Sequence, residues 1–275
     1  MKSRSAAAPF TVWMLLFTVV PLAMVVWFAF TDHEGAFTLD NIVIIGEHLD
    51  TLGRSILLGG ISTVICLLLA YPLAYSISRA TERVQQTMVM IIMLPMWMNF
   101  LLRTYAWMTL LENNGLINQF LRLIGILKEG QSLEMINTQG AVVLGMVYNF
   151  LPFMVLPLYS VMAKLDNRII EAAQDLGSNG FQVLLRVILP LSVPGILSGI
   201  TMVFVPAVST FVITKLLGGS KVLLIGDAIE TMFIGQGANY NVGAALSLVL
   251  MVLILLCMAM TSFAAKDDEE GGLVL

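Results

Sequence analysis

Long apolar runs separated by short polar segments dominate the sequence. A helix needs roughly 20 mainly apolar residues to span a bilayer. The runs of that length are residues 10–30, 55–77, 87–111, 140–162, 191–217 and 242–263. We therefore expect an all-α integral membrane protein, a single transmembrane domain over residues 1–275 with six spanning helices. An acidic tail, residues 266–275, follows the last run.

The polar segment at residues 165–190 predicts a short helix, a sharp turn and a second helix that enters the membrane. Asp166 or Asn167 can accept hydrogen bonds from the free N–H groups of a first helical turn. Gly177 stands where a helix ends in a left-handed residue, a conformation that glycine adopts without strain. A small polar helix between two spans is a typical docking point for a soluble partner.

The distribution of Lys and Arg predicts the orientation, because short cytoplasmic loops retain these residues. In a six-span arrangement one side carries Lys2, Arg4, Arg79, Arg83, Lys164, Arg168, Arg186 and Lys266. The other side has only Arg122, Lys128 and Lys221 clear of the membrane. We expect a multi-pass protein of the cell membrane with both termini and segment 165–190 in the cytoplasm. Asp227 and Glu230 then belong to an acidic outer face.

Composition supports a membrane protein and limits its chemistry. Hydrophobic residues make up 58% of the 275 positions and charged residues 12%, against roughly 25% charged in soluble domains. We expect lipid surroundings and no nucleic-acid partner. The apolar runs contain no Asp or Glu, the only histidines are His33 and His48, and no phosphate-binding loop motif is present. These absences argue against catalysis, a metal site and ATP hydrolysis in this chain. A self-contained channel stays open as an alternative.

The third run is unusually polar for a membrane helix, where polar groups need water or partners. Its candidates for lining a substrate pathway are Trp97, Asn99, Arg103 and Tyr105. Arg103 and Tyr105 also fit an ordinary position at the outer membrane interface. Prolines inside four spans predict kinks suited to a protein that changes shape, namely Pro72, Pro95, Pro152, Pro157 and Pro206.

Segment 165–190 carries a specific resemblance. Glu171-Ala172-Ala173, then Gly177, then Val187-Ile188-Leu189-Pro190 resembles the EAA signature of permease subunits of ATP-binding-cassette importers, with Val187 where Ile is usual. The resemblance implies the type I importer fold and a coupling helix in which Glu171, Ala172, Ala173 and Gly177 contact an ATPase. It also implies an ATPase dimer that binds ATP and Mg, a second permease, and an extracytoplasmic solute-binding protein. No cofactor is expected in this chain.

Further motifs resemble the spermidine/putrescine permease group. They are Pro95-Met96-Trp97-Met98-Asn99, Leu102 to Trp107, Asn114 to Asn118, Leu151 to Tyr159, Leu216 to Gly219 and Ile225-Gly226-Asp227, with Met96 where Phe is common. This resemblance implies polyamine import with a non-identical second permease. Trp97 suits a cation–π contact, and Asp227 and Glu230 suit the arriving cation. Import of thiamine, ferric iron or phosphonate by the same architecture remains the alternative.

Overall fold

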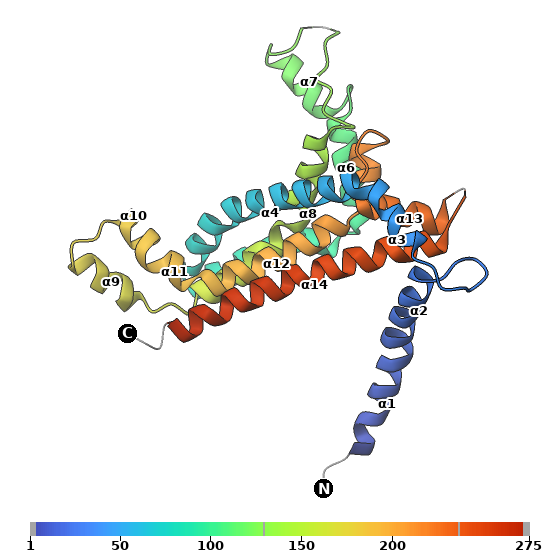
Figure 1. Ribbon diagram of the computed structural model, residues 1–275. Coiled ribbons are helices and arrows are strands. Elements are labelled where there is room, and N and C mark those ends of the chain that lie inside the picture. The colour runs from blue at the N-terminus through green and yellow to red at the C-terminus, as the bar shows by residue number, and fades with distance from the viewer. Residues whose placement is uncertain (1–3, 129, 236, 272–275) are drawn as a thin grey trace.

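The computed structural model describes residues 4–128, 130–235 and 237–271, and its regular elements there are helical. The main bundle consists of long helices that run side by side in Figure 1: α4 (Leu49–Ser78), α8 (Gln139–Met162), α12 (Val193–Ser209) and α14 (Tyr240–Gly271). Helix α8 is central and packs against both α4 and α12, while α14 packs against α12. Met146, Met154 and Leu158 of α8 are fully buried in this core.

Small residues let the central helices approach closely. A Cβ added at Gly199 of α12 would lie 2.5 Å from the sulfur of Met154, and one at Gly195 would lie 3.1 Å from the carbonyl oxygen of Pro157. Both glycines are buried against α8. A side chain at Gly195 would crowd a backbone carbonyl, and one at Gly199 would have to displace the Met154 side chain, so both glycines favour the close approach of α12 and α8.

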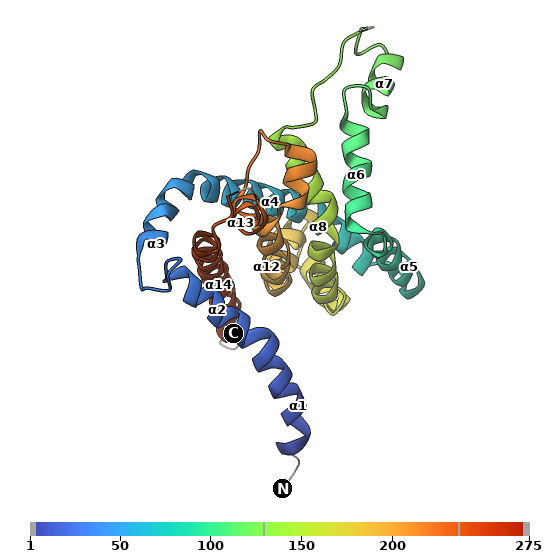
Figure 2. The ribbon, with the colours of Figure 1, turned by 90° about the vertical axis from the view of Figure 1, so that its right-hand side faces the viewer.

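The N-terminal helix leaves the bundle. It comprises α1 (Arg4–Met14), the π-helical turn η1 (Leu15–Val19) and α2 (Val20–Ala29), and its spanning part, Pro9–Ala29, has only 6% of its most apolar stretch buried. Only α2 packs against α14, and Figures 1 and 2 show α1 projecting away from the other helices. Helix α3 (Asp40–Ile44) and turn η2 (Ile45–His48) then lead directly into α4.

The third apolar run, expected as one span over residues 87–111 with a kink at Pro95, is sharply bent. Helix α5 (Glu82–Met93) and the 3-10 turn η3 (Leu94–Trp97) meet α6 (Phe100–Leu111) and α7 (Leu116–Leu123) at 87°. Met98 is extended, with φ −78° and ψ 150°. Asn99 restarts the helix, because its Oδ1 accepts a hydrogen bond from the Leu101 N–H at 2.8 Å. Among the prolines expected to kink spans, Pro95 lies beside this bend, whereas the others stay inside α4, α8 and α12.

The fifth run is also broken, at both of its ends. The segment before it, α10 (Gly180–Val183), η4 (Leu184–Ile188) and α11 (Leu189–Leu191), meets α12 at 68°. Helix α12 ends at Ser209 rather than near residue 217. After two non-helical residues, Thr210 and Phe211, the chain forms the π-helical turn η5 (Thr214–Gly218) and then α13 (Ile225–Ile234).

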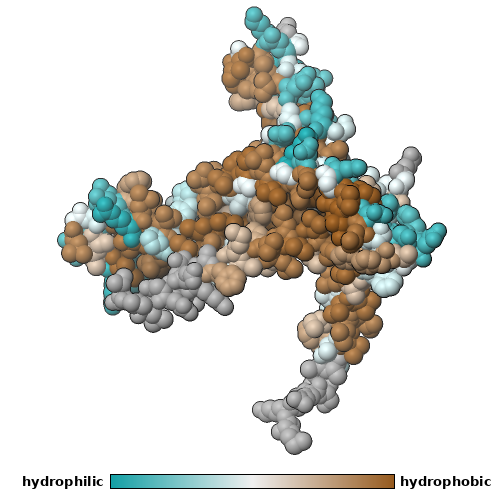
Figure 3. Space-filling model, viewed as in Figure 1, coloured by the Kyte–Doolittle hydropathy of each residue, from teal (hydrophilic) through white to brown (hydrophobic). Residues whose placement is uncertain are grey.

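These elements suit a bilayer. Within the described residues four helices are long and apolar enough to cross a membrane, or up to six if each bent pair is one span. Figure 3 shows an apolar band across the bundle, with hydrophilic surface near α9 and α10 at one end and near α7 at the other. Helix α14 continues beyond the sixth run through Gly271. The acidic segment expected as a tail is therefore helical up to that residue, and residues 272–275 lie outside the described part.

Candidate coupling and pathway sites

The segment at residues 165–190 folds as its sequence predicts. Helix α9 (Asn167–Asp175) begins where Oδ1 of Asp166 accepts the Arg168 N–H at 3.0 Å. At its other end the Gly177 N–H donates to the Gln174 carbonyl at 2.8 Å and the Ser178 N–H donates to the Ala173 carbonyl at 3.1 Å. Gly177 has φ +86°. These two bonds and the left-handed glycine form a Schellman motif, which satisfies the last carbonyls of the helix.

No side chain of α9 is buried. Glu171, Ala172 and Gly177 are exposed, and Ala173 is half-buried. The helix lies with α10 at one end of the bundle, apart from α7 (Figure 1). Because local capping rather than tertiary packing holds α9 together, its surface is free to contact another molecule.

Arg79 connects this exposed segment to the bundle. It follows the last residue of α4 and donates from Nη2 to the Met162 carbonyl at 3.2 Å and from Nη1 to the Leu165 carbonyl at 3.2 Å and to Oδ1 of Asn167. These bonds satisfy carbonyls at the end of α8 and hold the start of α9. From the sequence alone, Arg79 indicates only a cytoplasmic positive charge. The sequence feature that could have indicated its structural role is its position directly after an apolar run, where a guanidinium can bind the free carbonyls at a helix end.

The candidates of the third run cluster at its bend. Trp97 is 79% exposed in η3, immediately before the bend, and Tyr105 is exposed on α6. Asn99 is exposed, but its side-chain oxygen caps α6. Arg103 is only 8% exposed and lies 6.0 Å from the Phe100 ring centre. Its Nε and Nη1 have no hydrogen-bond partner among the described residues. Arg103 is thus turned into the protein, unlike its three neighbours.

The two outer-face carboxylates expected to meet a cation have different surroundings. Asp227 is 2% exposed, and its oxygens accept hydrogen bonds from the Thr214 hydroxyl at 2.8 Å and the Leu224 N–H at 2.9 Å. Burial raises the pKa of Asp227, although both hydrogen bonds act in the opposite direction. Asp227 fastens the start of α13 to η5, a position closed to solvent rather than on an acidic outer surface.

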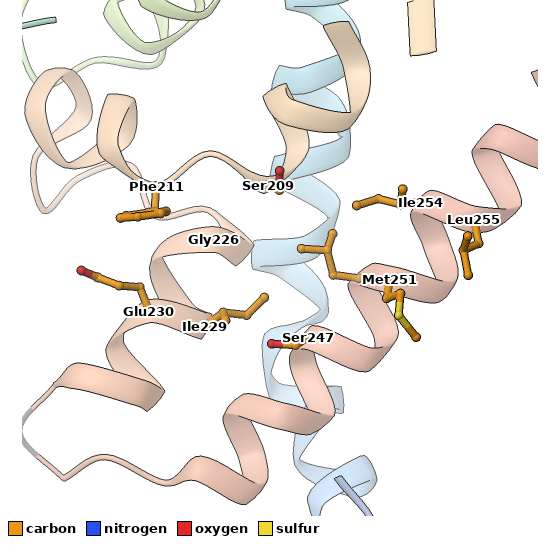
Figure 4. A pocket seen from close by; sticks show the side chains of 10 residues that line it. Ser209, Phe211, Gly226, Ile229, Glu230, Ser247, Met251, Ile254 and Leu255 are labelled. Atoms are coloured by element: carbon orange, nitrogen blue, oxygen red, sulfur yellow. The ribbon is translucent and has the colours of Figure 1, made fainter. Parts of the chain in front are cut away.

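Glu230, one turn later in α13, stays accessible. It pairs with Lys215 and borders a cleft of about 400 Å³ between the end of α12, α13 and α14 (Figure 4). No hydrogen bond or ion pair found in the described part of the chain joins Glu230 to the bend that carries Trp97. No set of three or more His, Cys, Asp or Glu residues that could hold a metal was found there either.

Comparison with known proteins identifies the family. A family model described as "Binding-protein-dependent transport system inner membrane component" matches residues 4–266. The chain belongs to this family. It is therefore a multi-pass inner-membrane permease component of a binding-protein-dependent importer and is not itself the catalytic subunit.

Curated relatives cover most of the chain. The spermidine/putrescine transport system permease protein PotB of Haemophilus influenzae is 39% identical over 252 residues, covering 89% of this chain and 87% of that protein. PotB of Escherichia coli is 35% identical over 250 residues, covering 88% and 90%. The inner membrane ABC transporter permease protein YdcU of Escherichia coli is 31% identical, covering 76% and 70%.

A solved structure confirms the fold. The bacterial ABC transporter involved in the import of the acidic polysaccharide alginate superposes with a TM-score of 0.79 at 18% identity, covering 94% of this chain and 93% of that one. The all-α architecture expected from the sequence is thus that of an ABC importer membrane domain.

Proposed function

We propose that this chain is one of two permeases that form the pathway of an ATP-driven polyamine importer. The observation that carries the proposal is its 35–39% identity, over about 88% of its length, to permeases named for spermidine and putrescine. The partners are a cytoplasmic ATPase dimer, which binds ATP and Mg, a second and non-identical permease, and an extracytoplasmic binding protein. In this arrangement both termini lie in the cytoplasm with α9.

Helix α9 is the proposed contact with the ATPase, through Glu171, Ala172, Ala173 and Gly177. The exposure of the whole helix and its local capping support this role. Arg79 is suited to pass its displacement to the membrane helices, because its hydrogen bonds link the start of α9 to the ends of α4 and α8.

Trp97, Asn99 and Tyr105 are the proposed pathway residues at the bend. Non-helical backbone at membrane depth is tolerated where it lines a cavity or is covered by protein, and the bend carries an exposed indole face on which an ammonium group gains about 0.5–2 kcal/mol. Arg103 is buried beside this surface and would repel a polyamine if it faced the path. Glu230 supplies an accessible carboxylate elsewhere in the chain.

The exposed N-terminal helix supports a second permease as partner. Only 6% of the most apolar stretch of this helix is buried, so most of its length has no packing contact with the rest of the chain. Lipid or another membrane protein must cover this apolar helix. In a complex of two permeases, the second permease would offer a protein surface for the helix to pack against.

The test is ligand-stimulated ATP hydrolysis by the complex of permeases, ATPase and binding protein in proteoliposomes. We expect spermidine or putrescine, with the binding protein, to stimulate hydrolysis and to be taken up. Trp97→Leu should abolish uptake while the ATPase remains bound. Stimulation by thiamine, ferric iron or a phosphonate but by neither polyamine would overturn the substrate assignment, and unchanged uptake by Trp97→Leu would remove that residue from the pathway.

A further inference from the structure

The cleft beside Glu230 combines a long apolar wall with a single acidic group. Its volume is about 400 Å³. The apolar lining comes from Phe211, Ile229, Leu250, Met251, Ile254 and Leu255. Figure 4 shows Phe211 and Glu230 on the same side of the cleft, across from the α14 side chains. Apolar walls suit a hydrocarbon chain, and the carboxylate suits a cationic group at the end of that chain.

Lys215 already supplies such a cation. Its ammonium contacts the Glu230 carboxylate, and the two side chains are 49% and 22% exposed. Glu230 lines the cleft but Lys215 does not, so the ion pair lies at the rim. A lysine side chain is four methylene groups that end in an ammonium. It therefore has the same chemistry as the aminobutyl end of a polyamine.

Buried contacts fix the positions of both partners. The Lys215 N–H donates to the Phe211 carbonyl at 3.0 Å, which places Phe211 one turn before Lys215. Thr214, the neighbour of Lys215, donates to Asp227, one turn before Glu230. A Cβ added at Gly226 would lie 2.6 Å from the carbonyl oxygens of Ser209 and Thr210. Turn η5 and α13 are thus locked together, and the Phe211, Lys215 and Glu230 side chains extend from fixed backbone.

We propose that this cleft binds one alkylammonium end of the transported polyamine, and that Lys215 occupies the Glu230 carboxylate until the ammonium of the substrate displaces it. The methylene chain of the substrate packs along the α14 side of the cleft, and its ammonium meets Glu230 beside the Phe211 ring. This inference rests on the proposed polyamine import. It adds a specific site and a built-in competitor to that function.

Displacement of Lys215 is easy because the pair is partly exposed. Exposed ion pairs contribute little, equivalent to at most about a fivefold change in an equilibrium constant. Removing the lysine ammonium should therefore tighten polyamine binding by about two- to fivefold. Removing the carboxylate should weaken it by about tenfold or more, because the substrate ammonium lies inside the cleft beside the Phe211 ring and its charge-assisted hydrogen bond is less exposed than the Lys215 pair at the rim.

The experiment measures equilibrium binding of radiolabelled spermidine to the complex of both permeases and the ATPase in nanodiscs, with the binding protein left out. We expect Lys215→Met to lower the Kd and Glu230→Gln to raise it. The double variant should match Glu230→Gln, because Lys215 acts only through that carboxylate. Lys221→Met and Glu134→Gln, which remove exposed charges from neighbouring loops, should leave the Kd within about twofold of wild type.

Three results would overturn the site: wild-type affinity in Glu230→Gln, no change in Lys215→Met, or the same tightening by Lys215→Met with and without Glu230. The last would show a long-range charge effect. Failure of the site is distinguishable from failure of the proposed function. In the first case the wild-type complex still takes up polyamine, and in the second it does not.

Discussion

Asp227 and Glu230 carry the same functional group on one helix but differ in burial, so they have different roles. The two carboxylates are three residues apart in α13, yet Asp227 is enclosed and holds η5 through Thr214, whereas Glu230 borders an open cleft. An enclosed carboxylate with both oxygens engaged is a fastening point. An accessible carboxylate whose ion pair with a lysine is partly exposed is available to a ligand.

Asp227 gives a pH-dependent prediction. Because burial raises its pKa above the unfolded value, Asp227 stabilises the fold fully only below the unfolded pKa, and this contribution is lost as the pH rises through the folded pKa. An Asn side chain can keep the same hydrogen-bond geometry. Its amide oxygen accepts from the Leu224 N–H, and its NH₂ group donates to the Thr214 hydroxyl oxygen. The Thr214 hydroxyl then donates to the Phe211 carbonyl, which lies 2.8 Å away. We expect the thermal midpoint of Asp227→Asn to gain on wild type as the pH rises from about 4 to 8.

Asp227→Ala is the matched destabilised variant. It leaves the buried Leu224 N–H unpaired and should lose about 1–3 kcal/mol. A gain for Asp227→Asn that shrank with rising pH would contradict the assignment. Loss of uptake in a fully folded Asp227→Asn would restore a direct role in the pathway.

The sequence pattern does not distinguish Asp227 from Glu230. Both lie in a segment between apolar runs, and the surroundings of Asp227 depend on a fold of residues 210–224 that brings the Thr214 hydroxyl and the Leu224 N–H to its carboxylate. The same holds for Arg79 and Lys215, whose partners are distant in sequence: Met162, Leu165 and Asn167 for one, Glu230 for the other. Residue roles set by long-range contacts are not encoded in local pattern.

At the scale of elements, local signals were sufficient for α9 and insufficient for the bends. The cap at Asp166 and the left-handed Gly177 operate within one or two turns, so the helix and its end are legible in the sequence. An apolar run, in contrast, indicates how long a membrane-spanning segment is but not where the helix bends within it. The 87° turn after Trp97, where Asn99 restarts the helix, and the end of α12 at Ser209 both fall inside apolar runs whose hydropathy shows no break.

The link between α9 and the bundle gives a second prediction. Arg79→Ala removes hydrogen bonds to three acceptors, so displacement of α9 should no longer reach α4 and α8 efficiently. We expect the number of solute molecules transported per ATP hydrolysed to fall several-fold in proteoliposomes. Arg79→Lys should recover it only in part, because the single nitrogen of an ammonium cannot reproduce the span of the two guanidinium nitrogens that reach these acceptors.

Arg83→Ala is the control, since Arg83 is exposed on α5. It removes a nearby charge of the same sign without touching the α8–α9 junction. An equal loss in both variants would indicate a general charge effect. An unchanged ratio in Arg79→Ala would exclude the arginine as a link.

The whole molecule has projecting arms rather than a closed surface. In Figure 1 the N-terminal helix leaves one side of the bundle, α6 and α7 rise from another, and α9 extends from one end. Much of the apolar surface of the N-terminal helix is uncovered. The six apolar runs in the sequence indicate a membrane protein. They do not indicate how the helices are arranged in space or which of them are left uncovered for other parts of a larger assembly.

This architecture predicts that the chain alone conducts nothing. Reconstituted without its partners, it should show no spermidine flux or ionic current above that of empty liposomes, because the proposed pathway forms only between two permeases. The full complex in parallel liposomes provides the positive control. Measurable current through the isolated chain would support a self-contained channel instead.

Because α9 has no buried side chains, selection for binding a partner and selection for a stable fold act on different residues of this chain. Substitutions on the exposed surface of α9 would change its fit to the proposed ATPase partner without opening a cavity or straining the core, provided that the cap and Gly177 are kept. Partner choice can therefore drift or be exchanged between related permeases while the membrane fold stays constant. A short, self-capped helix thus lets the proposed cytoplasmic contact surface change in sequence while the packed helices of the bundle stay as they are.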